Sequence, residues 1–175
     1  IKVLEIRKKI PSFHNKGLET EEYVIHPSPN SYFMRDPAAL TQNGVISSNM
    51  KYSGRQFESH LLKTIFQHHD DFRNEFHEVF PGTTGDFSIP TIEGGDVIII
   101  SPKVLAIGCS ERTESEAIRQ VARNVLSGGQ VERVYGVKLP QRRNYMHLDT
   151  VFSIIDENLV VTYPDAIDDL LETSV

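Results

Sequence analysis

One segment near the middle of the sequence, residues 93–139, constrains the fold more than any other. It opens with two apolar runs, Val97–Ser101 and Val104–Gly108, on either side of Pro102 and Lys103. Short runs rich in β-branched residues that flank a proline-containing turn are typical of a β-hairpin. We therefore predict two antiparallel strands here.

A helix and a further strand are predicted after this hairpin. Apolar residues recur at helical spacing through about residues 114–127, where Thr113 and Glu116 have the spacing of a capping box and Gly128 ends the pattern. Residues 131–139 then alternate in character as the two faces of a strand do. The segment thus predicts a ββαβ unit, and the chain an α/β fold.

Parts of the same unit recur on both sides of it. Upstream, a short strand at Gly44–Ser48 precedes a helix that Ser53 opens. The apolar face predicted for that helix comprises Phe57, Leu61, Leu62, Ile65 and Phe66. Downstream, residues 150–155 and 159–162 predict another hairpin. The sequence therefore predicts two full modules and part of a third.

An acidic residue stands at the start of each predicted module. These are Asp36, Asp96 and Asp149, and the pattern also brings in Glu93 and His147 beside the second and third of them. Because modules of this length usually stack or close around an axis, equivalent strand ends meet at one place. We expect these five side chains to converge there.

Several carboxylates around one point require a cation. A planar guanidinium offers five N–H donors in a fixed fork, so two carboxylates can hold it while its central carbon stays accessible. A histidine beside an acidic group adds proton transfer near neutral pH. Because like charges that are buried together cannot all ionise easily, we expect the pKa of at least one of these acids to be raised. The alternative for each acid taken singly is a solvated strand end.

Composition excludes several classes of function. The formal net charge of -6 and the pI near 5.6 come without a Lys/Arg stripe, so we expect no nucleic-acid partner. The longest apolar run, Val97–Ile100, is far too short to span a bilayer, and we expect a cytoplasmic protein without a membrane partner. The lone Cys109 cannot form a disulfide within the chain.

Four motifs in this order resemble the arginine deiminase family of guanidine-modifying enzymes. They lie at residues 29–37, 93–97, 110–113 and 146–152, and the resemblance extends from about Tyr23 onward. It implies a partial α/β propeller, or pentein, built of ββαβ modules where the family has five. It also implies hydrolysis of L-arginine to L-citrulline and ammonia through a covalent S-alkylthiouronium intermediate, without a cofactor or a metal.

The resemblance implies a role for each motif residue. Asp36 and Asp149 would grip the guanidinium nitrogens, and Glu93 and His147 would be the acid/base pair. Asp149 favours the deiminase branch, because the related dimethylarginine hydrolases typically carry lysine there. The substrate-binding residues implied in addition are Asn30, Arg55, Arg112 and Asp96, the two arginines pairing with the α-carboxylate.

The sequence departs from the family in two respects. The nucleophilic cysteine and a substrate-binding arginine that the family carries near its C-terminus are absent, and we interpret Cys109 as a packing residue. We expect a piece of a longer protein, with residues 1–22 the remnant of a helical insertion and its exit loop, and residues 23–175 a partial propeller. Its open edges would suit a second copy or the missing remainder of its own chain.

Two other functions stay open at this point. Glu93, Asp96, His147 and Asp149 could instead be the ligands of a metal-dependent hydrolase. The chain could also be a non-catalytic arginine-binding or interaction module, which the missing nucleophile would explain. The metal-like run at residues 68–71 is interpreted as a solvated helix end.

Overall fold

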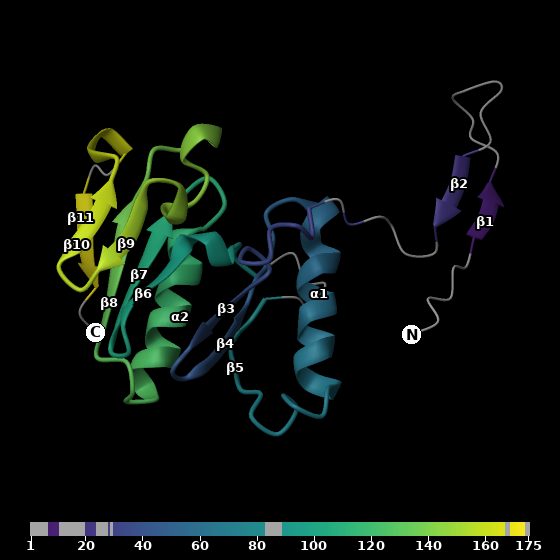
Figure 1. The fold of residues 1–175 in the computed structure, drawn as a ribbon, viewed down its shortest axis with the longest axis horizontal. Helices are drawn as coiled ribbons and strands as arrows, with labels where there is room; N and C mark the ends of the chain where they lie inside the picture. The colour runs from purple at the N-terminus through teal and green to yellow at the C-terminus, as the bar shows by residue number, and fades with distance from the viewer. Residues whose placement is uncertain are drawn as a thin grey trace.

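The computed structural model describes residues 7–10, 20–23, 28, 30–82, 89–166 and 169–173. Within these ranges it contains two ββαβ modules in succession (Figure 1). The first consists of β3 (Ala38–Thr41), β4 (Gly44–Ser47), α1 (Ser53–His68) and β5 (Glu78–Pro81). In it, β3 pairs antiparallel with β4, and β5 pairs parallel with β4 after the helical crossover.

The second module repeats this connectivity and has the longer strands. It consists of β6 (Val97–Ser101), β7 (Val104–Cys109), α2 (Ser115–Ser127) and β8 (Arg133–Lys138). β6 and β7 form the predicted hairpin, and β8 lies parallel to β7. The predicted order of hairpin, helix and strand is confirmed in this module. A further strand, β11 (Asp169–Thr173), pairs antiparallel with the free edge of β8.

The remaining strands form two hairpins. β9 (Phe152–Asp156) pairs with β10 (Leu159–Thr162), as the sequence predicts for the start of a third module. β1 (Arg7–Ile10) pairs with β2 (Thr20–Tyr23), while residues 11–19 lie outside the described ranges. The interpretation of residues 1–22 as the remnant of a helical insertion stays a prediction.

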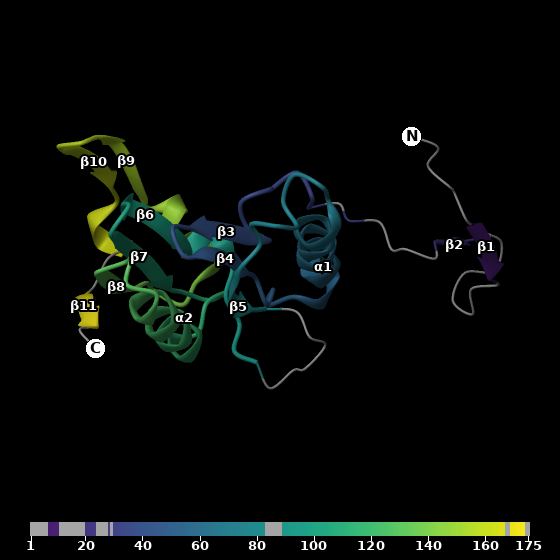
Figure 2. The ribbon, with the colours of Figure 1, turned by 90° about the horizontal axis from the view of Figure 1, so that it is seen from below.

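The main core forms where α2 lies between the sheets of the two modules, as Figures 1 and 2 show from two directions. α2 contacts β5 of the first module as well as β7 and β8 of its own. Val121 and Val125 are fully buried there, together with Phe80 of β5 and Ile107 of β7. Complete burial of such a side chain contributes about 1.5–3 kcal/mol, so this helix joins the two modules firmly.

The face that α1 buries differs from the predicted one. Phe57, Leu61 and Ile65 are 37%, 45% and 38% exposed, whereas Arg55 and Glu58 are buried. The prediction of an apolar buried face was therefore wrong for these three residues. The physical reason is that the first turns of α1 border a polar cavity, and a buried guanidinium and carboxylate satisfy each other there.

None of the described helices combines the length and the apolar character that a membrane span needs.

Candidate active site

Three short 3₁₀ helices bring the chemically important residues to the same end of the modules. η1 (Gly94–Asp96) leads into β6, η2 (Arg143–Tyr145) precedes the third hairpin, and η3 (Leu148–Thr150) leads into β9. η1 contacts both η3 and β3, so the starts of all three modules adjoin. The segments that carry Asp36, Glu93 and His147 therefore meet, although they are far apart in the sequence.

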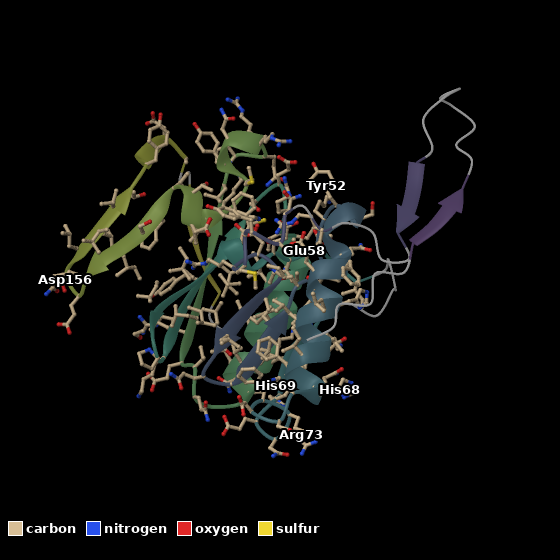
Figure 3. All side chains as sticks on the ribbon, turned by 45° about the vertical axis from the view of Figure 1, so that its right-hand side comes forward. Tyr52, Glu58, His68, His69, Arg73 and Asp156 are labelled. Carbon is tan, nitrogen blue, oxygen red and sulfur yellow. The ribbon has the colours of Figure 1, made fainter. Side chains whose placement is uncertain are left out.

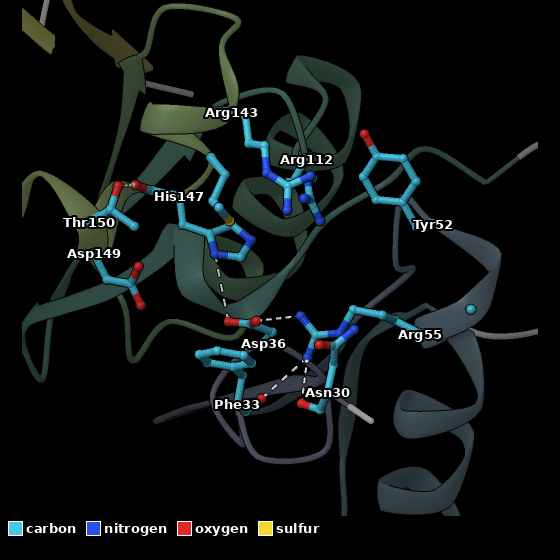
Figure 4. A pocket seen from close by; sticks show the side chains of 12 residues that line it. Asn30, Phe33, Asp36, Tyr52, Arg55, Arg112, Arg143, His147, Asp149 and Thr150 are labelled. Carbon is cyan, nitrogen blue, oxygen red and sulfur yellow. Dashed lines mark hydrogen bonds and ion pairs between the residues drawn. The ribbon is translucent and has the colours of Figure 1, made fainter. Parts of the chain in front are cut away.

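A cavity of about 930 Å³ opens at this meeting point (Figure 4). Of the residues implied by the motifs, those that line it are Asn30, Asp36, Arg55, Arg112, His147 and Asp149. The other lining residues are Phe33, Tyr52, Gly54, Arg143, Met146 and Thr150. Glu93 and Asp96 are not part of this lining, and each is 0% exposed. They act on the cavity only through the residues that they touch.

His147 lies between two carboxylates. Its Nε2 is 2.7 Å from Oε2 of Glu93, and its Nδ1 is 3.6 Å from Oδ1 of Asp36. Burial works to lower the pKa of His147, but the hydrogen bond to Glu93 and the nearby negative charges outweigh it and raise the pKa above its ordinary value. His147 can therefore hold a proton near neutral pH and present Nδ1–H toward Asp36 and the cavity.

Glu93 stays ionised beneath this histidine. Burial works to raise its pKa, but the hydrogen bond with His147 and the backbone amide of Lys51 hold the pKa below its ordinary value. The amide donates to Oε1 over 3.0 Å, and Nη1 of Arg112 lies 3.5 Å from Oε2. Glu93 thus fixes the His147 ring and keeps it basic.

Asp149 faces the cavity from the start of the third module. Burial raises its pKa above the ordinary value, while the charges of His147 and Arg35 act in the opposite direction. Nε of Arg35 lies 3.6 Å from Oδ2 of Asp149, and Nη2 of Arg35 donates to the carbonyl oxygen of Val97 over 2.8 Å. Arg35, the residue before Asp36, thereby ties the first module to the third.

Arg55 is already occupied by protein groups. Its Nη1 donates to Oδ2 of Asp36 over 2.5 Å, and its Nη2 donates to Oε2 of Glu58 over 2.7 Å. Nη2 also approaches the carbonyl oxygens of Asn30 and Phe33 at 3.3 and 3.4 Å. Few donors of Arg55 are left for a ligand carboxylate, so in this structure it chiefly orients Asp36.

Arg112 has more free hydrogen-bonding capacity. Its Nε is buried without a hydrogen-bond partner among the described residues, and the nearest carboxylate oxygen, on Glu111, is 3.8 Å away. The ring of Tyr52 covers its guanidinium at 4.4 Å, and the Tyr52 hydroxyl donates to Glu111 over 2.7 Å. Arg112 lines the cavity, and its guanidinium makes no hydrogen bond within the described residues, so it is better able than Arg55 to receive a ligand carboxylate through its outer nitrogens.

Asp96 supports the site from below. Its Oδ2 accepts hydrogen bonds from Ser110 and Thr113 at 2.7 and 2.6 Å, and its Oδ1 accepts the amide of Leu148 at 2.9 Å. It therefore holds the residue that follows His147. The predicted capping box was wrong, because the N-cap of α2 is Glu114 without a side-chain bond and Thr113 binds Asp96 instead.

We expect Asp96 to make stability fall as pH rises. Burial raises its pKa from 3.8 to about 7. Between these values the folded protein keeps a proton that the unfolded chain has lost, so each step in pH favours unfolding. The contribution of protonated Asp96 to stability is complete below about pH 4 and is lost as pH rises through about 7. When the wild-type chain and Asp96→Asn are denatured at pH 4 to 8, the free energy of unfolding should decline less steeply with pH in the variant. An equal dependence of the free energy of unfolding on pH in the two proteins would contradict the raised pKa of Asp96.

Sequence reasoning missed the residues that orient the predicted ones. Glu58, Arg35 and Tyr52 each hold a site residue in place, and Arg143 lines the cavity beside Arg112 (Figure 4). Arg35 adjoins Asp36 in the sequence, and Tyr52 and Glu58 each lie three positions from Arg55. Their positions could therefore have indicated them. Arg143 gave no such sign, because only tertiary folding brings η2 to the cavity.

Two other predicted features lie away from the cavity. Figure 3 shows His68 and His69 at the opposite end of α1 from Tyr52 and Glu58, and both histidines are exposed, as a solvated helix end would be. Cys109, the single cysteine of the sequence, is half-buried against the main core, and burial raises the pKa of its thiol. It is not one of the lining residues.

Comparisons with known proteins agree with this architecture. A family model described as arginine deiminase matches residues 2–175. The arginine deiminase of Levilactobacillus brevis is 36% identical over 157 residues, which cover 89% of this chain and 38% of that protein. The chain thus spans well under half the length of this relative.

Two solved structures share the fold. One is the product-bound N-terminal domain of ArgZ, a cyanobacterial arginine dihydrolase, with a TM-score of 0.62 and 23% identity over 80% of this chain and 46% of that one. The other is DDAH from Pseudomonas aeruginosa complexed with citrulline, with a TM-score of 0.60 and 22% identity over 75% of this chain and 46% of that one. These likenesses confirm the predicted class, a partial α/β propeller.

Proposed function

Because the chain belongs to the arginine deiminase family, we propose that it carries the guanidinium-binding and proton-transfer groups of an enzyme that converts L-arginine and water to L-citrulline and ammonia. The observation that carries this proposal is one cavity with acidic groups, Asp36 and Asp149, on one wall and Arg112 with Arg143 on another (Figure 4). A ligand that has a cation at one end and a carboxylate at the other suits this distribution of charge.

The acidic wall would hold the guanidinium. Asp36 and Asp149 belong to different modules, and each has its own arginine partner, Arg55 and Arg35. Both carboxylates border the cavity, so each could accept N–H donors from a guanidinium between them. Such a ligand would be held with its carbon facing His147, which is the orientation that attack on that carbon requires.

The basic wall would hold the α-carboxylate. Arg112 lines the cavity without a side-chain hydrogen bond in the described part of the chain, and Tyr52 restrains its guanidinium plane. Asn30 and Arg55 also line the cavity, but they lie beside Asp36 on the acidic side, where Asp36 and Glu58 take up the donors of Arg55 (Figure 4). This arrangement would select substrates that carry both charged ends and would discriminate against a guanidinium without a carboxylate.

Proton transfer would use His147. Its raised pKa lets it arrive protonated, donate from Nδ1 to the departing ammonia, and then take a proton from the attacking water. Glu93 would stabilise the imidazolium throughout, since it stays ionised. The covalent step needs a thiolate at the guanidinium carbon, and Cys109 does not line the cavity.

We therefore expect this chain to bind L-arginine without converting it. Calorimetric titration should give saturable binding with a Kd of roughly 1 mM or below, and a citrulline assay should detect no useful turnover. Asp36→Asn should weaken binding, since it removes a charged acceptor from the guanidinium end. An absence of saturable binding, or turnover that Cys109→Ser abolishes, would overturn the proposal.

A metal-dependent hydrolase is the second candidate, because Asp36, Glu93 and His147 offer ligand atoms within 4.8 Å of one another. Each of these residues already has a protein partner, however, since His147 bonds to Glu93 and Arg55 to Asp36. A cation here would also face the guanidiniums of Arg55 and Arg112. Metal content after dialysis separates the two candidates: a stoichiometric divalent ion favours the metal enzyme.

A further inference from the structure

Glu58 is a buried acid outside the set of residues implied by the motifs. It lies on the second turn of α1, and its side chain is 2% exposed. Both of its carboxylate oxygens face Arg55, with Nε at 3.3 and 3.2 Å and Nη2 at 2.7 Å from Oε2. Such bidentate pairing fixes the plane of the guanidinium.

Arg55 is therefore held between two carboxylates of different kinds. Glu58 takes the edge formed by Nε and Nη2, while Asp36 takes Nη1. Only Asp36 of these two lines the cavity. A guanidinium locked on one side by Glu58 presents Nη1 in a constant direction, so Oδ2 of Asp36 is held and Oδ1 is left toward His147 and the cavity.

The charge balance of this triad matters as much as its geometry. A pair made of Asp36 and Arg55 alone would be neutral and would attract a cationic ligand weakly. With Glu58 the three groups carry a net charge of -1, from two carboxylates and one guanidinium. Glu58 thus offsets the charge of Arg55 and leaves that of Asp36 available to the cavity.

We propose that Glu58 is a positioning residue of the guanidinium subsite: it locks Arg55 and offsets its charge, so that Asp36 stays oriented toward a ligand guanidinium and keeps its attraction for it. This inference rests on the proposed function for the identity of the ligand. A purely structural helix pair would not need burial, as the exposed pair of Glu116 and Arg119 at the same spacing on α2 shows.

The test compares Glu58→Gln with the control Glu116→Gln, which removes the same charge from an exposed pair with the same three-residue spacing. Both variants are titrated with L-arginine and with methylguanidine, which has no carboxylate. Glu58→Gln should lower the affinity for both ligands by a similar factor, about tenfold, while the control variant binds them as the wild type does. Glu58→Asp should restore part of the loss, because it keeps the charge.

A second measurement follows the pKa of His147 by NMR without ligand. The titratable groups facing this ring are Glu93, Asp36, Asp96 and Asp149. Glu58→Gln should lower the His147 pKa, because Asp36 would then be neutralised more fully by Arg55. If the wild type binds neither ligand, the proposed function fails, while this shift still supports the positioning role.

Two results would overturn the inference. One is wild-type binding and an unchanged His147 pKa in Glu58→Gln. The other is a loss of binding that follows a lowered melting temperature and that Glu58→Asp does not reverse, because that pattern describes a stability residue.

Discussion

Replacing Gly95 by alanine is expected to disrupt the site directly, because this glycine packs against both His147 and Asp36. The added Cβ would lie 2.5 Å from Nδ1 and 2.7 Å from Cγ of His147, and 3.0 Å from Oδ1 of Asp36. Those atoms belong to a ring and a carboxylate that are both held by other bonds, so neither can move freely. The variant should lose about 1–3 kcal/mol of stability and on the order of a hundredfold in L-arginine affinity.

The mechanism of this loss can be followed at His147 itself. A displaced ring would weaken its hydrogen bond with Glu93, so the His147 pKa should move down from its raised value. NMR titration measures this directly. Gly54→Ala is a control for stability alone, because Gly54 lines the cavity; a Cβ there meets no atom within 4 Å, and alanine favours a helix by up to ~1 kcal/mol. An unchanged His147 signal in Gly95→Ala would show that the site can absorb the methyl group.

Arg55→Met is expected to produce the second large effect, a loss of about 3–5 kcal/mol in the free energy of unfolding. The substitution keeps the unbranched apolar stem of the side chain but leaves Asp36 and Glu58 buried without their shared counter-ion. The loss of stability comes from the two buried carboxylates that are left without a counter-ion, and not from the lost pairing energy alone. Chemical denaturation at neutral pH measures it.

Two companion variants test this explanation of the loss. Arg119→Met removes the exposed counterpart on α2 and should cost about 0–1 kcal/mol. Adding Glu58→Gln to Arg55→Met should recover part of the stability, because one stranded charge disappears. A double variant as unstable as the single one would mean that the burial of Glu58 is not the source of the loss.

The parts of the fold that could be predicted are those with a strong local period. The hairpin of β6 and β7, helix α2 and strand β8 follow from apolar spacing and turn residues, and the structure has them within a few residues of the predicted bounds. Strands β3, β5 and β11 were not predicted. They are four or five residues long, and such short segments owe their conformation to pairing with distant neighbours.

The site was predictable to a similar extent. Acids and a histidine at repeated positions indicated where chemistry would gather, and Asp36, His147 and Asp149 do border one cavity. Sequence alone could not show that Glu93 and Asp96 lie beneath it, because burial is a property of what packs above a residue. The same limit explains why α1 was expected to bury Phe57 and instead buries Arg55.

The sequence by itself determined the modular order and the types of residue available at each module start, since local periodicity and the motif residues are written along the chain. Only the tertiary structure decided how those residues divide their bonds. Arg55 is taken up by Asp36 and Glu58, while Arg112 keeps a donor without a partner in the described residues. That division depends on distances between segments that are separated in sequence, and such distances are fixed only when α2 packs between the two sheets and brings the module starts together.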